Sequence, residues 1–304
     1  MTGALRPAPS RTAAMIISET APAKINLALT VRGRRPDGYH EIESLVTFAD
    51  AGDRVTFRSG PECRVTLSGP FAGDIAGQNL LERALLLLRD RDPGLQLGAV
   101  HLEKNLPVAA GLGGGSADAA ALLRAVRRAN PERAGVVAWH EVAARLGADV
   151  PVCLAARAAL IWGIGDRVEP LPTGSLPAMA AVLVNPRMPL ATAQVYQALA
   201  APPVPADHAA APALPGPFPE LASLVDVMRA RGNDLEAAAT RLLPAIATIK
   251  GALAALPGCR VAALSGSGPT CFGVFATRQE ADDAAALLAQ SRPDWWIAPV
   301  GLAS

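Results

Sequence analysis

The sequence Gly111-Leu112-Gly113-Gly114-Gly115-Ser116 runs directly into an alanine- and leucine-rich segment that ends at Arg128. This second segment predicts a helix over residues 117–128, because its arginines gather in the C-terminal half, where the helix dipole favours cations. Glycines let backbone N–H groups crowd around an anion, and a helix start adds unpaired donors. The pattern predicts a phosphate-binding loop, with Ser116 as the helix N-cap and Asp118 in the first turn.

Other well-known glycine-rich segments do not fit this loop. No Lys-Ser or Lys-Thr pair follows the last glycine, so the loop is not of the Walker A type. The third glycine of a Rossmann fingerprint would fall at Ser116, and the His-Arg-Asp and Asp-Phe-Gly motifs of protein kinases are absent. A flexible linker is the remaining alternative, and the helix predicted immediately downstream argues against it.

Hydrophobic patterning along the rest of the chain predicts short strands and helices in irregular order. Strands are expected at residues 15–17, 25–31, 54–57, 64–67, 100–103, 159–162, 181–185, 260–264, 270–275 and 296–300, with 54–57 and 64–67 paired. Helices are expected at residues 80–91, 139–146, 235–256 with a break at Pro244, and 278–290. This order lacks a regular β-α-β alternation, which favours an α+β fold over a doubly wound sheet.

Composition excludes several classes of protein. The chain has 304 residues, enough for two domains, and its net charge of +1 gives no reason to expect a nucleic-acid or membrane partner. The four cysteines form no Cys-x-x-Cys pair, which argues against a zinc site or disulfide framework and favours the reducing cytoplasm. Apolar stretches are interrupted well before the roughly 18 residues of a membrane span.

Two segments stand apart from this patterning. Residues 1–14 contain two arginines, no acidic residue and no apolar core of a signal peptide, so we expect a disordered N-terminal extension. Strong patterning begins just after Met15, which leaves open whether Met1 or Met15 is the start. Residues 201–219 hold seven prolines amid alanines and predict an irregular surface insertion without a catalytic role.

Three motifs in order resemble those of the GHMP kinase superfamily. Residues 23–27 (Ala-Lys-Ile-Asn-Leu) resemble the first motif, residues 107–117 the second, and residues 264–270 (Leu-Ser-Gly-Ser-Gly-Pro-Thr) the third. Together they span most of the chain. The resemblance implies a two-domain α+β fold, with a ribosomal-S5-like N-terminal domain (15–165), a ferredoxin-like C-terminal domain (166–304) and the active site in the cleft between them.

Further segments resemble one branch of the superfamily, the kinases that phosphorylate cytidine diphosphate methylerythritol in the non-mevalonate isoprenoid pathway. These segments are residues 22–27, 34–40, 147–151 and 232–236. Asp37-Gly38-Tyr39-His40 discriminates best, because galactokinases and mevalonate kinases have other recognition segments. The resemblance implies ATP and magnesium (Mg2+) as cofactors, a cytoplasmic monomer or homodimer, and no nucleic-acid or membrane partner. Residues 233–236 are interpreted as helix capping.

Lys24 and Asp149 are the predicted catalytic pair. Phosphoryl transfer to an alcohol needs positioning, charge compensation at the γ-phosphate, and a group that accepts or orients the hydroxyl proton. By resemblance, Asp149 contacts the acceptor hydroxyl, while Lys24 contacts both Asp149 and the γ-phosphate. Whether Asp149 removes the proton or only orients the hydroxyl stays open.

The resemblance also assigns binding residues. Those expected to bind ATP are Pro107, Val108, Ala109, Ala110, Gly111, Leu112, Gly113, Gly114, Gly115, Ser116, Ala117, Asn79 and Lys104, with Asn79 near the adenine and Ser116 able to reach phosphate or magnesium. Those expected to bind the acceptor are Asn26, Tyr39, His40, Tyr196, Gly266 and Thr270. Aromatic rings stack on a pyrimidine, and an imidazole hydrogen-bonds its edge. Asn26 follows Lys24 by two residues, so both face one side of the strand.

Two other functions remain as alternatives. The first is another GHMP kinase, acting on mevalonate, homoserine or a sugar, and the Asp-Gly-Tyr-His segment argues against it. The second is a non-catalytic nucleotide- or RNA-binding protein built on the ribosomal-S5-like fold. The near-neutral charge and the presence of both Lys24 and Asp149 argue against this second alternative.

Overall fold

The computed structural model describes residues 14–303 except residues 76, 78 and 205–216. The described strands join in one sheet whose main path runs β3-β4-β2-β10-β7-β9-β8, with β1 and β5 paired to β2, and β6 paired to β5. The strands are β1 (Ile16–Arg34), β2 (His40–Ser59), β3 (Val65–Ser68), β4 (Gly98–Glu103), β5 (Ala159–Gly163), β6 (Arg167–Pro170), β7 (Met179–Asn185), β8 (Val261–Leu264), β9 (Cys271–Phe275) and β10 (Trp296–Leu302).

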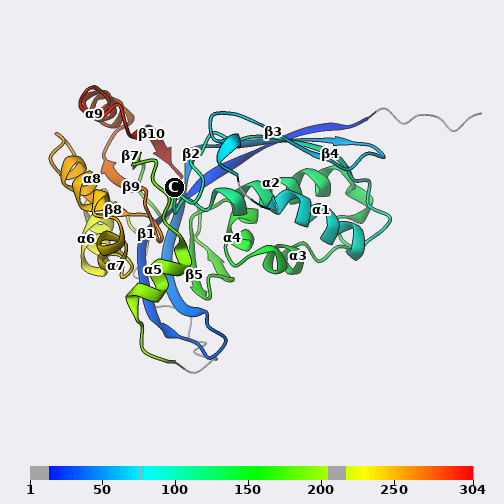
Figure 1. Ribbon diagram of the computed structural model, residues 1–304, viewed down its shortest axis with the longest axis horizontal. Coiled ribbons are helices and arrows are strands. Elements are labelled where there is room, and N and C mark those ends of the chain that lie inside the picture. The colour runs from blue at the N-terminus through cyan, green and yellow to red at the C-terminus, as the bar shows by residue number, and fades with distance from the viewer. Residues whose placement is uncertain (1–13, 76, 78, 205–216, 304) are drawn as a thin grey trace, which may run out of the picture.

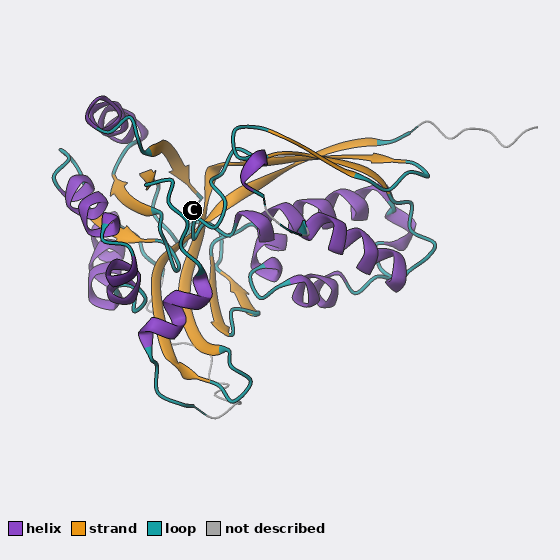
Figure 2. Cartoon of the chain, in the orientation of Figure 1, coloured by secondary structure: helices purple, strands orange, loops and turns teal. Residues whose placement is uncertain are grey.

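Helices cover this sheet in two lobes (Figure 1). Helices α1 to α4 pack beneath β1 to β4 in one lobe, and α6 to α9 surround β7 to β10 in the other, as the colouring of Figure 2 makes plain. The helices are α1 (Leu80–Arg91), α2 (Gly114–Ala129), α3 (Trp139–Leu146), α4 (Val150–Ala155), α5 (Thr192–Leu199), α6 (Leu221–Arg231), α7 (Glu236–Leu242), α8 (Ala245–Ala254) and α9 (Arg278–Ser291), with short 3-10 turns at Ala72–Asp74 and Pro131–Arg133. The irregular order of strands and helices around one mixed sheet confirms the predicted α+β class.

The long hairpin of β1 and β2 serves both lobes. Its antiparallel register runs from Ile16 opposite Arg58 to Arg34 opposite His40, with three register shifts. In the half nearer its turn, Leu29 of β1 donates its N–H to Gly232 O and its carbonyl accepts from Asp234 N, both in the C-terminal half. The separate strands predicted at residues 15–17 and 25–31 are therefore one strand, since the proline between them sits at a register shift and does not end the pairing.

The predicted pairing of residues 54–57 with 64–67 is wrong. Strand β4 lies between them, antiparallel to β2 and parallel to β3. Short apolar runs that follow each other in sequence look like a hairpin, but here α1 separates β3 from β4 and returns the chain into the gap. The local pattern of apolar residues does not show that β4 lies between β2 and β3.

Helix α2 is the central packing element of its lobe. Its alanines are buried against β1 and β2, and small side chains let the helix approach the strands closely. The apolar face predicted for α1, with Leu81, Ala84, Leu85 and Leu88, packs into the same core. The bounds predicted for α1 and α3 and the break at Pro244, between α7 and α8, are confirmed.

Some expectations lie largely outside the described residues. Of the N-terminal extension only Ala14 is described, and of the predicted insertion only residues 201–204 and 217–219. The boundary near residue 165 stays a prediction, because β1 and β2 contact both halves. Among the residues described, none of the helices has the length and apolar character that a membrane crossing requires.

Glu43 joins the hairpin to the C-terminal half. It is buried on β2 and accepts hydrogen bonds from Arg32 of β1 and Arg231 of α6. Burial opposes ionisation of this carboxyl, but the hydrogen bonds from the two guanidinium groups outweigh burial and lower the pKa of Glu43. The ionised form of Glu43 therefore stabilises the contact between α6 and the hairpin through its hydrogen bond with Arg231.

We expect Glu43→Gln to lower the free energy of unfolding at pH 7 by about 2 kcal/mol, because two charge-assisted hydrogen bonds lose their charge. Since the pKa of Glu43 is lower in the folded chain, its contribution is present above the unfolded value of 4.5 and is lost as pH falls through the folded value. Urea denaturation should show that the difference in free energy of unfolding between the wild type and Glu43→Gln becomes smaller as the pH falls below 4.5. Glu62→Gln, at an exposed pair with Arg64, is the control. A gap independent of pH would contradict this role.

Candidate active site

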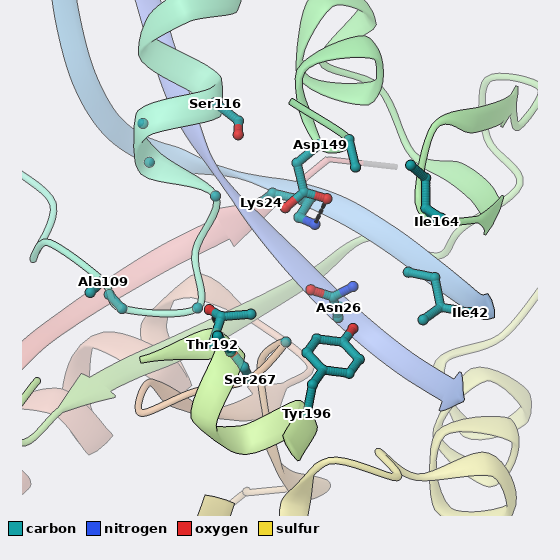
Figure 3. Close-up of a pocket in the computed structure, with 18 of the residues that line it drawn as sticks. Lys24, Asn26, Ile42, Ala109, Ser116, Asp149, Ile164, Thr192, Tyr196 and Ser267 are labelled. Carbon is teal, nitrogen blue, oxygen red and sulfur yellow. Dashed lines mark hydrogen bonds and ion pairs between the residues drawn. The ribbon is translucent and has the colours of Figure 1, made fainter. Parts of the chain in front are cut away.

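A cavity of about 1250 Å³ opens where the two lobes meet. Its walls come from β1, the loop before α2, the turn before α4, the start of α5 and the loop between β8 and β9. Figure 3 shows Lys24 and Asp149 on one side, Ser116 at the start of α2, and Tyr196 and Thr192 of α5 opposite. Segments far apart in sequence thus converge on one space.

Lys24 and Asp149 form an ion pair in this cavity. The ammonium Nζ of Lys24 lies 2.6 Å from Oδ1 of Asp149. The lysine side chain is 5% exposed, while that of Asp149 is 36% exposed, so the carboxylate is the member that a ligand can reach. Asp149 precedes α4 without capping it, which leaves its second oxygen available to a ligand.

The glycine-rich loop is held in place by its backbone. Gly111 (φ +74°) and Gly113 (φ +64°) adopt left-handed conformations that favour glycine, and a Cβ on Gly111 would lie 2.4 Å from the Ser265 carbonyl oxygen. Leu112 O accepts the backbone N–H of Lys24 at 2.9 Å. The loop therefore has a defined shape, and Gly113 to Ser116, at the start of α2, line the cavity.

Helix α2 begins earlier than predicted. Its N-cap is Gly113, so Ser116 lies in the first turn and Asp118 in the second, and the predicted capping role of Ser116 is wrong. Glycine at the cap reaches the left-handed conformation that ends the loop, a cause that the alanine-rich pattern did not reveal. The hydroxyl of Ser116 is consequently free of capping and lines the cavity.

The loop between β8 and β9 is fastened to the glycine-rich loop. The buried hydroxyl of Ser265 accepts the Asn26 N–H at 3.3 Å and donates to Gly111 O at 3.0 Å, while Thr270 N donates to Ala110 O. Asn233 adds a third connection, since its Nδ2 donates to Leu264 O and Gly266 O. Three loops from distant parts of the chain thus form one rigid cavity wall.

Lys104 is held beneath the loop by two carboxylates. Its Nζ lies 2.6 Å from Asp53 Oδ2 and 2.8 Å from Asp118 Oδ2, and all three side chains are buried. Burial raises the pKa of Asp118 to about 7 against the attraction of Lys104, and the nearby charge of Asp53 adds to the rise. Asp53 Oδ1 also accepts the N–H groups of Asn105 and Leu106.

Two buried polar atoms at this end of the cavity have no partner within the described residues. They are Asn79 Nδ2 and Asp118 Oδ1, and both residues line the cavity. The other amide atom of Asn79 is used, since Oδ1 accepts from Leu81 N and caps α1. Buried polar atoms are rarely left unpaired, so these two are suited to a polar ligand.

The residues expected to bind the acceptor lie mainly on the opposite wall. The rings of His40 and Tyr196 are 4.7 Å apart and tilted by 34°, whereas Tyr39 is 58% exposed at the rim. Burial, with a smaller effect of the Arg34 charge, lowers the pKa of His40 and favours its neutral form. Asn26 shares the wall with Lys24 and donates from Nδ2 to Ser44 Oγ.

The structure does not bring every expected residue to the cavity. Thr270 is fully buried, accepts from Asn185 Nδ2 and does not line the cavity, since its side chain faces β7. Leu112 and Ala117 point into the core instead. The other residues expected to bind ATP or the acceptor all line the cavity.

Several residues were missed because nothing in the local sequence marks them. The capping interpretation of residues 233–236 is incomplete: Asn233 Oδ1 accepts from Leu235 N in the turn before α7, but its Nδ2 also bridges two loops, and Asp234 Oδ2 accepts from Val31 N. Asp53 was not singled out, and the hydroxyls of Thr192 and Ser267 meet at 2.8 Å in the cavity wall. Among the described residues, no group of three or more His, Cys, Asp or Glu side chains forms a metal site.

Comparisons with known proteins agree on the family. Residues 79–157 match the model of the GHMP kinases N terminal domain, and residues 210–291 match that of the GHMP kinases C terminal domain. Relatives from Parvibaculum lavamentivorans (47% identical, over 92% of this chain and 96% of the relative) and from a strain of Rhodopseudomonas palustris (45%, over 93% and 96%) are both named 4-diphosphocytidyl-2-C-methyl-D-erythritol kinase.

Solved structures give the same result. A crystal structure of 4-(cytidine 5'-diphospho)-2C-methyl-D-erythritol kinase is 35% identical, with a TM-score of 0.73 and coverage of 95% of this chain and 100% of that one. A homoserine kinase from Cytophaga hutchinsonii, 16% identical with a TM-score of 0.64 over 99% and 97% of the two chains, shows the shared fold alone.

We expect Ser265→Ala to lower the free energy of unfolding by about 1–3 kcal/mol, because the Asn26 N–H and the Gly111 carbonyl lose a buried partner. Urea denaturation measures the loss. Ser291→Ala, at the exposed end of α9, is the matched control and should stay within about 0.5 kcal/mol of the wild type. Equal stability of the two variants would show that Ser265 does not hold the loops together.

Proposed function

The chain belongs to the GHMP kinase family, and we propose that it transfers the γ-phosphate of ATP to the 2-hydroxyl of 4-diphosphocytidyl-2-C-methyl-D-erythritol, which gives the 2-phosphate and ADP. This reaction is a step of the non-mevalonate route to isoprenoid precursors. One observation carries the proposal: the Lys24–Asp149 pair lies in a single cavity between the glycine-rich loop and the Tyr39-His40 hairpin. The more distant likeness to a homoserine kinase concerns the fold and favours no second acceptor.

The glycine-rich loop supplies the site for the ATP phosphates. Its left-handed glycines and the start of α2 offer backbone N–H groups and the positive end of a helix dipole, which stabilise phosphate oxygens. The unpartnered Asn79 Nδ2, a buried donor in the same cavity, supports an adenosine site at that end. Lys104 is already neutralised by two carboxylates, so we assign it to holding the loop as much as to binding nucleotide.

Magnesium fits the site only together with the nucleotide. Mg2+ prefers oxygen ligands and commonly uses substrate phosphates with one or two protein groups. The Ser116 hydroxyl and the unpartnered Asp118 Oδ1 both line the cavity near the start of α2, and the Ser116 hydroxyl is the group that we assign to the ion. Bound Mg2+ would neutralise charge on the phosphates.

Asp149 and Lys24 perform the transfer in this proposal. The partly exposed carboxylate of Asp149 accepts a hydrogen bond from the acceptor 2-hydroxyl, and the ammonium of Lys24 holds that carboxylate in place. Lys24 also compensates charge on the γ-phosphate as it moves to the acceptor oxygen. The proton passes to Asp149 or leaves with the phosphate, and Asp149 orients the hydroxyl in either case.

The acceptor's cytosine lies between Tyr39 and Tyr196, with His40 at its edge, and Asn26 contacts the polyol. His40 and Tyr196 are already in ring contact, and the exposed ring of Tyr39 is free to close over the base. Gly266, which brings backbone close to Asn26, completes the wall.

The four free cysteines support a location in the reducing cytoplasm, and a monomer or homodimer is proposed.

A coupled ADP-release assay tests the function. With ATP and the cytidine diphosphate methylerythritol as substrates we expect turnover, and with mevalonate or homoserine none. Turnover of mevalonate or homoserine at a comparable kcat/KM would replace this proposal with the alternative kinase.

We expect Asp149→Asn to lower kcat by roughly 10²–10⁴-fold, since the nearly isosteric amide loses the charge that orients and activates the hydroxyl. Both substrates should still bind. Tyr39→Ala provides the contrast, because it removes a stacking face remote from the transferred phosphate and should raise KM for the acceptor while ATP binding is spared. Steady-state kinetics with each substrate varied separate the two effects. A near-normal kcat in Asp149→Asn would remove Asp149 from the chemistry.

We expect Gly113→Ala to raise the KM for ATP by about tenfold, because an alanine at φ +64° is strained by roughly 1–2 kcal/mol and its Cβ would press on the Lys24 stem at 3.3 Å. Gly135→Ala is the matched control, at an exposed glycine with open space around it. Unchanged ATP kinetics in a folded Gly113→Ala protein would place the phosphates elsewhere.

A further inference from the structure

The cavity contains one arginine, Arg34, whose charge is not neutralised by any of the residues that the structure describes. Three Lys or Arg side chains line the cavity within the described residues: Lys24, Lys104 and Arg34. Lys24 is paired with Asp149, and Lys104 with two aspartates. The guanidinium of Arg34 makes no hydrogen bond or ion pair in the part of the chain that the structure describes, although arginines on both sides of it, Arg32 and Arg35, do.

Backbone hydrogen bonds orient Arg34. Its N–H donates to Pro202 O at 2.7 Å, and its carbonyl accepts from Val204 N at 2.8 Å, so both backbone groups point away from β2. Arg34 and His40, which are opposite each other in the hairpin, therefore form a non-hydrogen-bonded pair. In such a pair the two side chains project from the same face and approach most closely.

His40 shows which way that face points. Its ring contacts Tyr196, and both residues line the cavity, so Arg34 faces the same space. The positive charge of Arg34 also contributes, after burial, to the lowered pKa of His40, as expected for a neighbouring cation. The hairpin tip projects past α5 and away from the start of α2 (Figure 1), so Arg34 is remote from the loop proposed for the ATP phosphates.

We propose that Arg34 binds the diphosphate group of the acceptor and so contributes to selection of a nucleoside diphosphate derivative. This inference rests on the proposed function, in which the base lies at His40 and Tyr196 and the reacting hydroxyl at Asp149. The diphosphate joins those two ends and must pass through the space between them. A planar guanidinium suits two phosphate oxygens at once, and its unpaired charge has no carboxylate to displace.

The test compares CDP with cytidine, which differ only in the diphosphate, as competitive inhibitors against the acceptor. In Arg34→Gln we expect the Ki of CDP to rise about tenfold, the usual scale of a partly exposed charge-assisted contact, while the Ki of cytidine stays nearly unchanged. Arg34→Lys should recover part of the CDP affinity. Arg58→Gln, an exposed arginine of β2 outside the cavity, is the matched control for loss of one positive charge and should match the wild type.

Other outcomes separate the inference from the function on which it rests. Suppose that the wild type phosphorylates the acceptor, but that Arg34→Gln raises the Ki of CDP and of cytidine equally or changes neither. The role proposed for Arg34 is then wrong, and the proposed function stands. If the wild type neither uses the acceptor nor binds CDP, both are wrong. An NMR titration gives a second readout: the pKa of His40 should rise in Arg34→Gln, and an unchanged pKa would contradict the placement of Arg34 beside His40.

Discussion

Lys24 carries its ammonium group into the interior between the two lobes, where it meets Asp149 at 2.6 Å. A buried ammonium without a partner would cost on the order of several kcal/mol, so the position of the carboxylate is constrained. The backbone N–H of the same residue donates to Leu112 O in the glycine-rich loop. One residue of β1 thereby connects the strand, the loop and the turn before α4, and the geometry of the proposed phosphate and acceptor sites depends on it.

The charges around the cavity follow a pattern that matches this constraint. Both lysines in its wall are neutralised by aspartates of the protein, and the glycine-rich loop carries no cationic side chain. In the proposed function, phosphates at that end meet backbone dipoles that are already oriented, and Lys24 adds its charge at the γ-phosphate. At the opposite end Arg34 has no charged partner among the described residues. The two ends thus differ in how they attract an anion, which agrees with the proposal that the cavity binds two different phosphorylated ligands.

Much of the architecture was predictable because its causes are local. The apolar period of α1 and the Pro244 break each depend on residues within a few positions, and both were predicted correctly. Errors arose where a distant segment intervened. Strand β4 separates β2 from β3, Thr270 turns to Asn185 on β7, and Gly113 replaces Ser116 as the cap because the loop must bend there to reach β1.

The sequence by itself determined the family motifs, the class of fold and the residue types of the site, because these are recorded in short ordered patterns. Only the tertiary structure decided which side chains meet. Lys104 contacts Asp53, which is 51 positions away in the sequence, and Ser265 contacts Gly111, which is 154 positions away. Such contacts depend on how the sheet and helices pack, and a polar residue that serves a distant partner has the same local signature as one exposed to solvent. Likewise, only the tertiary structure distinguishes Arg34, which has no charged partner among the described residues, from Arg32 and Arg35, which are paired with glutamates.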